Sequence, residues 1–131
     1  IQLQVRGICS LIPGVPGMSD NIEAISIVDN YLEHSRIYIF ENAGQTEVYI
    51  SSADFMTGNL GERVEVTCPK YDQRIKQALI DNFDIGWKGN VKVRYHSYTL
   101  DNKYRTRYHN PIFRAQLETY KYYQKKLDTE V

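Results

Sequence analysis

The sequence is short of cysteine, of net charge and of long apolar runs, and each shortage excludes a class of protein. Its two cysteines, Cys9 and Cys68, are too few for a disulfide framework or a zinc cluster, so we interpret them as reduced thiols. The formal net charge is zero, which removes the overall basic field that draws a protein onto nucleic acid or anionic lipid. No segment reaches the ~20 apolar residues of a membrane span, and no signal-peptide pattern is present. We therefore expect a soluble, cytoplasmic protein without a nucleic-acid partner, in which any anion site is local.

The chain does have enough apolar residues for a core. Its length of 131 residues is that of one ordinary domain, and 42% of these residues are hydrophobic. It starts at Ile1 without a methionine, inside a stretch that alternates apolar and polar residues, so we expect a fragment of a longer protein. Strand-like and helix-like segments alternate without repeats or linkers, which predicts an α/β (α+β) fold with a mixed β-sheet flanked by helices, in a single domain over residues 1–131.

The hydrophobic periodicity places the individual elements. The expected strands are 1–8, 22–28, 37–40, 47–51, 64–68 and 91–95, and the expected helices are 54–60, 72–83 and an amphipathic terminal helix from Phe113. Ser52 or Asp54 would cap the first helix and Asp72 the second, because short polar side chains accept hydrogen bonds from the free amides of a first turn. The strand at 37–40 is apolar on both faces, which predicts a central position in a covered sheet.

A histidine and an arginine stand two residues apart just before that strand. Side chains at this spacing on a strand point to the same face, so His34 and Arg36 can converge on one ligand. An imidazole beside a permanent guanidinium suits phosphate chemistry, because the arginine holds oxygens and the histidine exchanges a proton. Taken alone, the pair is better explained by a local hydrogen bond of His34 and a surface position of Arg36.

The strand at 47–51 ends in small polar residues that lead into a helical turn. Ser51, Ser52 and Asp54 follow one another there, and the exposed amides and hydroxyls of such a turn favour an anion. A capping turn without any ligand has the same pattern. Together with His34 and Arg36, this segment resembles one half-site of the phospholipase D superfamily, in which His-x-Lys is followed by Gly-Ser-x-Asn. Arg36 stands at the lysine, Ser51 at the glycine and Asp54 at the asparagine.

Those three departures are expected in one phospholipase D-like family, that of the polyphosphate kinases. Its signatures occur here in order: Arg-Gly-Ile-Cys from Arg6, Pro-Gly-x-x-Gly from Pro13, Tyr-Leu-Glu-His-Ser-Arg-Ile from Tyr31, Tyr-Ile-Ser-Ser-Ala-Asp from Tyr49, and Asn-Leu then Arg-Val-Glu from Asn59. The first 70 residues or so resemble the carboxy-terminal catalytic domain of that family closely, and the remainder resembles it more loosely. Gly58 stands where many relatives carry an arginine.

The resemblance implies a phospholipase D-like fold and a part in the reversible transfer of the terminal phosphate of ATP to polyphosphate. It implies that Arg6 and Arg63 bind nucleotide phosphates and that His34 is a second active-site histidine; we expect Arg36 and Ser52 to contribute to the same phosphate site. Arg6, His34 and Arg63 should then face one cleft. The phosphorylated histidine would lie in a preceding catalytic domain of the same chain, which leaves the isolated fragment inactive.

The same resemblance implies further partners of the complete enzyme. ATP or ADP and polyphosphate would be its substrates, and Mg²⁺ would act in the whole enzyme with no ligand set in this piece. A homo-oligomer is expected, in the cytoplasm or associated with a membrane without crossing it. None of these partners is indicated by composition or spacing.

Two alternatives remain at this point. A phospholipase D-like phosphodiesterase, such as a nuclease or lipase, would prefer lysine at position 36 and asparagine at position 54. A non-catalytic dimerisation or polyanion-binding module would be favoured by a His34 that is buried away from any cleft. His96 and His109 lack partners at metal-ligand spacing and are interpreted as structural or solvent-facing. The tyrosines concentrated between Tyr95 and Tyr123, Tyr108 among them, are assigned to packing and to an interface with the rest of the chain.

Overall fold

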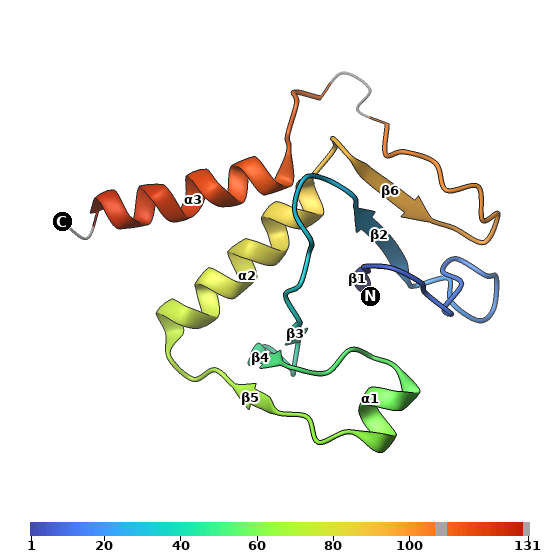
Figure 1. Ribbon diagram of the computed structural model, residues 1–131, viewed down its shortest axis with the longest axis horizontal. Coiled ribbons are helices and arrows are strands. Elements are labelled where there is room, and N and C mark those ends of the chain that lie inside the picture. The colour runs from blue at the N-terminus through green and yellow to red at the C-terminus, as the bar shows by residue number, and fades with distance from the viewer. Residues whose placement is uncertain (107–109, 130–131) are drawn as a thin grey trace. The chain divides into compact units, whose positions relative to one another are not determined.

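The computed structural model describes residues 1–106 and 110–129, and its strands fall into two three-stranded sheets rather than one (Figure 1). The chain divides into two compact units. We call Ile1–Glu33 together with Ile85–Val131 the terminal unit, and His34–Asp84 the inner unit. The predicted mixed α/β class is confirmed. Periodicity identifies strands without saying which of them pair, and that is why the sequence pointed to a single sheet.

The sheet of the terminal unit contains both parallel and antiparallel pairs. β1 (Gln2–Gln4) runs parallel to β2 (Glu23–Ile27), and β2 pairs antiparallel with β6 (Val93–His96). Ile25 of the central strand is fully buried, as is Val93. β1 is shorter than the predicted 1–8, because the chain bonds β2 only as far as Val5 and then turns at Gly7, whose φ of +83° suits glycine.

A serine in the central strand of this sheet joins its two neighbours. The Ser26 hydroxyl donates to the carbonyl oxygen of Val5 (2.6 Å) and lies 2.6 Å from His96 Nε2. Because the hydroxyl hydrogen is used by Val5, Nε2 of His96 donates to the Ser26 oxygen. His96 therefore has a structural contact, whereas Tyr108 and His109 lie outside the described residues.

Helix α2 (Gln73–Lys88) begins where the sequence predicted and runs five residues further than expected. The Asp72 carboxylate accepts from the amides of Arg74 (2.8 Å) and Ile75 (3.3 Å), so the predicted N-cap is confirmed. At the other end Gly86 packs against Gln4, whose Cδ would lie 3.0 Å from a Cβ added at Gly86. A glycine inside a helix is destabilising by itself, and here the close approach of the Gln4 side chain accounts for it.

The terminal helix α3 (Ala115–Thr129) carries an exposed apolar stripe. Ala115 is buried, but Leu117, Tyr120 and Leu127 are exposed by 47%, 63% and 68%. The predicted amphipathic helix is present. Its apolar face is not covered by the part of the chain that the structure describes.

The inner unit is built on an antiparallel sheet of β3 (Ile37–Phe40), β4 (Glu47–Ser51) and β5 (Thr67–Pro69), in that order. The predicted turn between β3 and β4 is closed by a hydrogen bond from the Gln45 amide to the Asn42 carbonyl (2.9 Å), with Ala43 and Gly44 both at positive φ. Positive φ at both central positions is the two-residue turn that matches strand twist. The predicted central position of β3 is wrong, because β4 lies in the middle and β3 at an edge.

The second apolar face of β3 contributes to an aromatic groove instead of a sheet interior. Tyr38 and Phe55 pack edge to face at 5.2 Å, and Phe40 packs likewise on Tyr49 at 5.9 Å. With Leu60 of α1 (Thr57–Glu62) they line a groove of about 250 Å³. α1 starts after Met56 with no side-chain cap, so the predicted caps and the start at position 54 are wrong.

Candidate functional site

The β3–β4 hairpin brings Arg36, just before β3, next to Asp54, just after β4. Pairing of Ile37 with Ile50 puts the start of one strand beside the end of the other. Arg36 Nε donates to Asp54 Oδ1 (2.8 Å) and Nη2 donates to Oδ2 (3.1 Å). The side chains are 18% and 36% exposed. The hydrogen bonds to Asp54 raise the pKa of the Arg36 guanidinium above its ordinary value, so its positive charge is permanent.

The third nitrogen of the same guanidinium is directed at His34. Arg36 Nη1 lies 3.3 Å from His34 Nε2 and 3.4 Å from the His34 carbonyl oxygen. A guanidinium has no acceptor, so Nε2 accepts this hydrogen bond and the ring hydrogen sits on Nδ1. His34 is exposed, and its Nδ1–H is the polar group that it can offer to a ligand.

The turn after β4 is held from several sides. The Ser52 hydroxyl donates to Glu65 Oε2 in a short hydrogen bond and accepts from the Val66 amide (3.0 Å). The Ala53 carbonyl accepts from the Tyr38 hydroxyl (2.8 Å). The hydroxyl of Ser52 is therefore already used by protein partners, and its predicted contact with phosphate stays a prediction.

Two predicted phosphate-binding arginines have no such partner. Arg63 is exposed directly after α1, and Arg6 is exposed before Gly7. Within the described ranges, 1–106 and 110–129, neither guanidinium makes a hydrogen bond or an ion pair. Both therefore keep all their donors for an anion. Arg6 belongs to the terminal unit and Arg63 to the inner unit, so the cleft predicted to unite them with His34 stays a prediction.

Sequence reasoning missed the partner of Arg36. It treated Asp54 as the counterpart of an asparagine and as a helix cap. One signal was available: a basic residue just before one strand of a hairpin and an acid just after the other lie side by side once the strands pair. Gly58, in α1, has open space around it, since an added Cβ would meet nothing within 4 Å.

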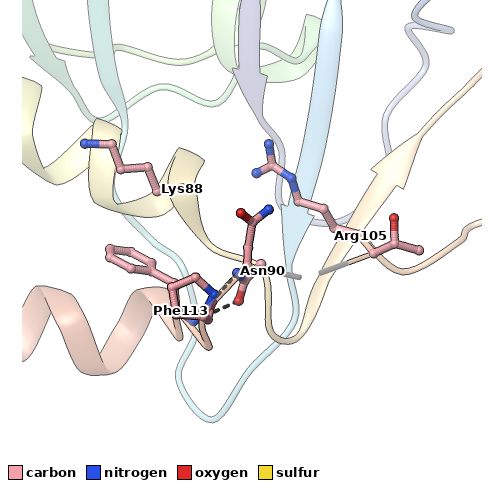
Figure 2. A pocket seen from close by; sticks show the side chains of 7 residues that line it. Lys88, Asn90, Arg105 and Phe113 are labelled. Carbon is pink, nitrogen blue, oxygen red and sulfur yellow. Dashed lines mark hydrogen bonds between the residues drawn. The ribbon is translucent and has the colours of Figure 1, made fainter. Parts of the chain in front are cut away.

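A second hollow, in the terminal unit, is lined by two polar side chains, Asn90 and Arg105, that hydrogen-bond to the backbone. Figure 2 shows Lys88 and Arg105 extending on either side of Asn90. Asn90 Oδ1 accepts from the Phe113 amide (2.8 Å) and its Nδ2 donates to Pro111 (2.8 Å). Arg105 Nη1 donates to the carbonyl oxygens of Trp87 and Gly89 at the end of α2. This arginine satisfies free carbonyls of a helix terminus, as basic side chains commonly do.

Metal and membrane features complete the description. In residues 1–106 and 110–129 there is no group of three or more His, Cys, Asp or Glu side chains that could hold a metal ion. None of the helices described combines the length and apolar character that crossing a bilayer requires.

Comparison with known proteins gives consistent matches. Residues 1–116 match the family described as polyphosphate kinase C-terminal domain 2. Polyphosphate kinase of Escherichia coli K12 is 53% identical over 122 residues, which are 93% of this chain and 18% of that protein, and the enzyme of Vibrio cholerae is 44% identical over the same length, 93% of this chain and 17% of that protein. The crystal structure of polyphosphate kinase from Porphyromonas gingivalis superposes with a TM-score of 0.93 at 42% identity, over 98% of this chain and 20% of that one. The chain thus spans about a fifth of the length of these relatives.

Proposed function

Because the chain belongs to the polyphosphate kinase family, through a match to its C-terminal domain over residues 1–116, we propose that it is part of an enzyme that transfers the terminal phosphate of ATP to polyphosphate. In that reaction the bond between the terminal phosphorus and its bridging oxygen breaks, ADP leaves, and a new P–O bond forms at the end of the polyphosphate chain. The reaction is reversible, with ADP as acceptor in the other direction. The transfer takes two steps: as ADP leaves, a P–N bond forms at a histidine of the preceding catalytic domain, outside these 131 residues, and that bond breaks when the P–O bond to polyphosphate forms.

The observation that carries the proposal is an exposed histidine held against a permanent cation. His34 presents Nδ1–H, because Arg36 occupies Nε2. That group can donate to an oxygen of the transferring phosphoryl group and stabilise the charge that develops there. His34 is thus the proposed catalytic residue of this chain.

We propose that the two arginines without a protein partner in the described ranges bind phosphate. Arg6 and Arg63 would grip oxygens of ATP or polyphosphate through planar pairs of N–H donors. Arg36 and Ser52 belong to the same region, but the acids Asp54 and Glu65 already accept from them. Arg36 and Ser52 would therefore contact phosphate while hydrogen-bonded to Asp54 and Glu65.

The carboxylates of the candidate site, among residues 1–106 and 110–129, do not fit a magnesium site. Mg²⁺ prefers carboxylate and water oxygens, and the carboxylates of Asp54 and Glu65 accept hydrogen bonds from Arg36 and Ser52. We therefore propose that the metal of the complete enzyme is held by other residues. We also propose that the complete enzyme is a homo-oligomer. Its proposed location is the cytoplasm, either free or associated with a membrane surface.

The geometry argues against the two alternatives. A phosphodiesterase of the phospholipase D type would use lysine and asparagine where Arg36 and Asp54 bind each other. A non-catalytic module would be supported by a buried His34, and His34 is exposed.

The test is phosphate transfer by the full-length protein. With labelled ATP it should form polyphosphate and one phosphohistidine, and peptide mapping should place that histidine outside this chain. The 131-residue chain alone, checked for folding by circular dichroism, should form neither product. A full-length protein without polyphosphate synthesis would refute the function, and stoichiometric phosphate on His34 would reverse the roles proposed for the two histidines.

A further inference from the structure

We propose that Arg36 and Asp54 are positioning residues for His34: Asp54 fixes the plane of the Arg36 guanidinium, and the remaining nitrogen of that group fixes the ring orientation and tautomer of His34. This inference rests on the proposed function, because it assumes that His34 acts in phosphoryl transfer. It gives Arg36 a different task from the two exposed arginines, although all three were predicted to bind phosphate.

The first support is the geometry of the guanidinium. Nε and Nη2 of Arg36 are bound to the two oxygens of one carboxylate, at 2.8 and 3.1 Å. A planar group held at two of its three nitrogens has a fixed direction for the third. That third nitrogen, Nη1, is within 3.3 Å of His34 Nε2 and 3.4 Å of the His34 carbonyl oxygen. Arg36 Nη1 therefore holds the imidazole ring of His34 against the backbone of that residue.

The second support is the accounting of donors and charge. Nε–H, one hydrogen on Nη2 and both hydrogens on Nη1 have acceptors, which leaves one of the five N–H groups for a ligand. The Asp54 carboxylate also cancels the Arg36 charge at short range. A phosphate oxygen approaching Arg36 would meet that carboxylate, whereas Arg63 has no acid bonded to it in the described ranges.

The third support is the rigidity of the base on which Asp54 stands. Asp54 directly follows Ala53, which is 4% exposed, donates its amide to the Ser51 hydroxyl (3.1 Å) and accepts from the Tyr38 hydroxyl (2.8 Å). The carboxylate therefore starts from a backbone with little freedom. Hydrogen bonds that orient a reactive group are effective when their own partners are held in this way.

A double-mutant cycle in the full-length enzyme separates positioning from binding. Arg36→Gln should lower kcat by about 10- to 100-fold, the cost of a reactive group displaced by about 1 Å, and should leave the KM for ATP within about 2-fold. Arg36→Lys should behave the same way, because an ammonium lacks the planar fork that binds both oxygens of Asp54 and fixes the direction of the donor to His34. In the His34→Ala background, Arg36→Gln should cause no further loss. A raised KM, or an undiminished loss in that background, would show that Arg36 contacts the substrate and would overturn the proposal.

A chemical measurement tests the same contact without any turnover. The unshared electron pair of an imidazole nitrogen attacks a carbonyl carbon of diethyl pyrocarbonate, and in the wild type Arg36 occupies that pair on Nε2 while Nδ1 carries hydrogen. Arg36→Gln and Asp54→Ala should therefore speed the modification of His34 by about 2- to 10-fold, as measured by peptide mass spectrometry. Equal rates in the wild type and in Arg36→Gln would overturn the proposal even if the enzyme proved to have another activity.

Matched controls lie in the same chain. Arg74→Gln removes another arginine of the inner unit that pairs with an aspartate, at 3.4 Å, and should change neither kcat nor the labelling of His34. His96, whose Nε2 is bound to Ser26, serves as an internal reference for labelling in every variant. If the wild-type protein makes no polyphosphate, the proposed function fails, and the labelling result still decides whether Arg36 orients His34.

Discussion

Each unit contains an aspartate that accepts two hydrogen bonds from one arginine, and the two pairs differ in burial and in what surrounds the guanidinium. In the terminal unit, Arg114 Nε and Nη2 donate to Asp29 at 2.8 and 2.6 Å, and the Asp29 side chain is 1% exposed. In the inner unit, Asp54 is 36% exposed and Arg36 also reaches His34. Similar bidentate chemistry thus appears once on a buried aspartate whose arginine is 37% exposed, and once beside an exposed imidazole.

The neighbours of the Arg114–Asp29 pair explain its different role. Gln116 accepts from the Tyr31 amide (3.0 Å) and donates to the Tyr31 carbonyl (2.8 Å) and to Glu33 (2.7 Å). Together with Arg114 it ties residues 29–33 to the start of α3. The hydrogen bonds from Arg114 hold the pKa of Asp29 below its ordinary value. We infer that this pair stabilises the fold, whereas the pair in the inner unit serves a reactive side chain.

Removal of His34 should give the largest effect on activity. It tests whether the Arg36–Asp54 pair of the inner unit serves a catalytic side chain. His34→Ala in the full-length enzyme should lower kcat by roughly 10²- to 10⁴-fold with little change in ATP affinity, as expected for a group that acts mainly in the transition state. Steady-state kinetics and direct ATP binding measure the two quantities, and circular dichroism checks the fold. A wild-type kcat with weaker ATP binding would make His34 a binding residue.

A smaller effect is expected for an arginine that has no carboxylate partner. Arg63→Ala should weaken ATP or polyphosphate binding and kcat together, by about 10- to 100-fold in kcat/KM, because charge-assisted hydrogen bonds to phosphate exist in both ground and transition states. Arg63→Lys should recover part of this loss, since it keeps the charge but not the planar fork. Arg74→Ala, another exposed arginine of the inner unit, is the matched control. An unchanged kcat/KM in Arg63→Ala would remove Arg63 from the site.

The smallest effect concerns local stability in the terminal unit. Asp29→Ala should speed hydrogen exchange at the Tyr31 amide by about 3- to 30-fold, because it leaves Arg114 without its acceptor. Exchange is followed by mass spectrometry of the full-length protein. Asp101→Ala breaks an exposed pair with Lys103 in the same unit and should leave that amide unchanged. Equal exchange in Asp29→Ala and wild type would contradict a stabilising role.

The acid dependence of the same amide has a definite sign. The pKa of Asp29 lies below 3.8 in the folded chain and near 3.8 when unfolded, so the stabilisation is complete above pH 3.8 and is lost as pH falls through the folded value. Protection of Tyr31, corrected for intrinsic exchange, should decline below that pH in the wild type but not in Asp29→Ala. A decline that begins well above pH 3.8 would point to another titrating group.

The sequence predicted elements better than it predicted neighbours. β3 and β4 have the predicted bounds, because a short apolar run and a turn at residues 42–45 are local properties of the chain. The edge position of β3 depends on which strands pair, and that information is not contained in the pattern of one strand. The late start of α1 has a similar cause: Ser52, expected as a cap, bonds Glu65 and Val66 thirteen and fourteen residues away.

The candidate site shows the same division. His34, Arg36 and the Ser-x-Asp turn were identified from residue types and from family resemblance. The pairing of Arg36 with Asp54 could not be read from them, because it depends on strand register and on the side-chain conformation of a long, flexible arginine. A motif identifies which residues belong to a site. The hydrogen bonds between them determine which charged groups remain available to a ligand.

The contact between Gly86 and Gln4 couples the substitutions that can accumulate at these two positions during evolution. Any side chain at position 86 would overlap the Gln4 amide where it now lies, so it would have to displace the flexible end of that side chain. A smaller residue at position 4 would remove the overlap, after which alanine at 86 would strengthen α2 by its greater helix propensity. The two positions, 82 apart in sequence but in contact, should therefore vary together.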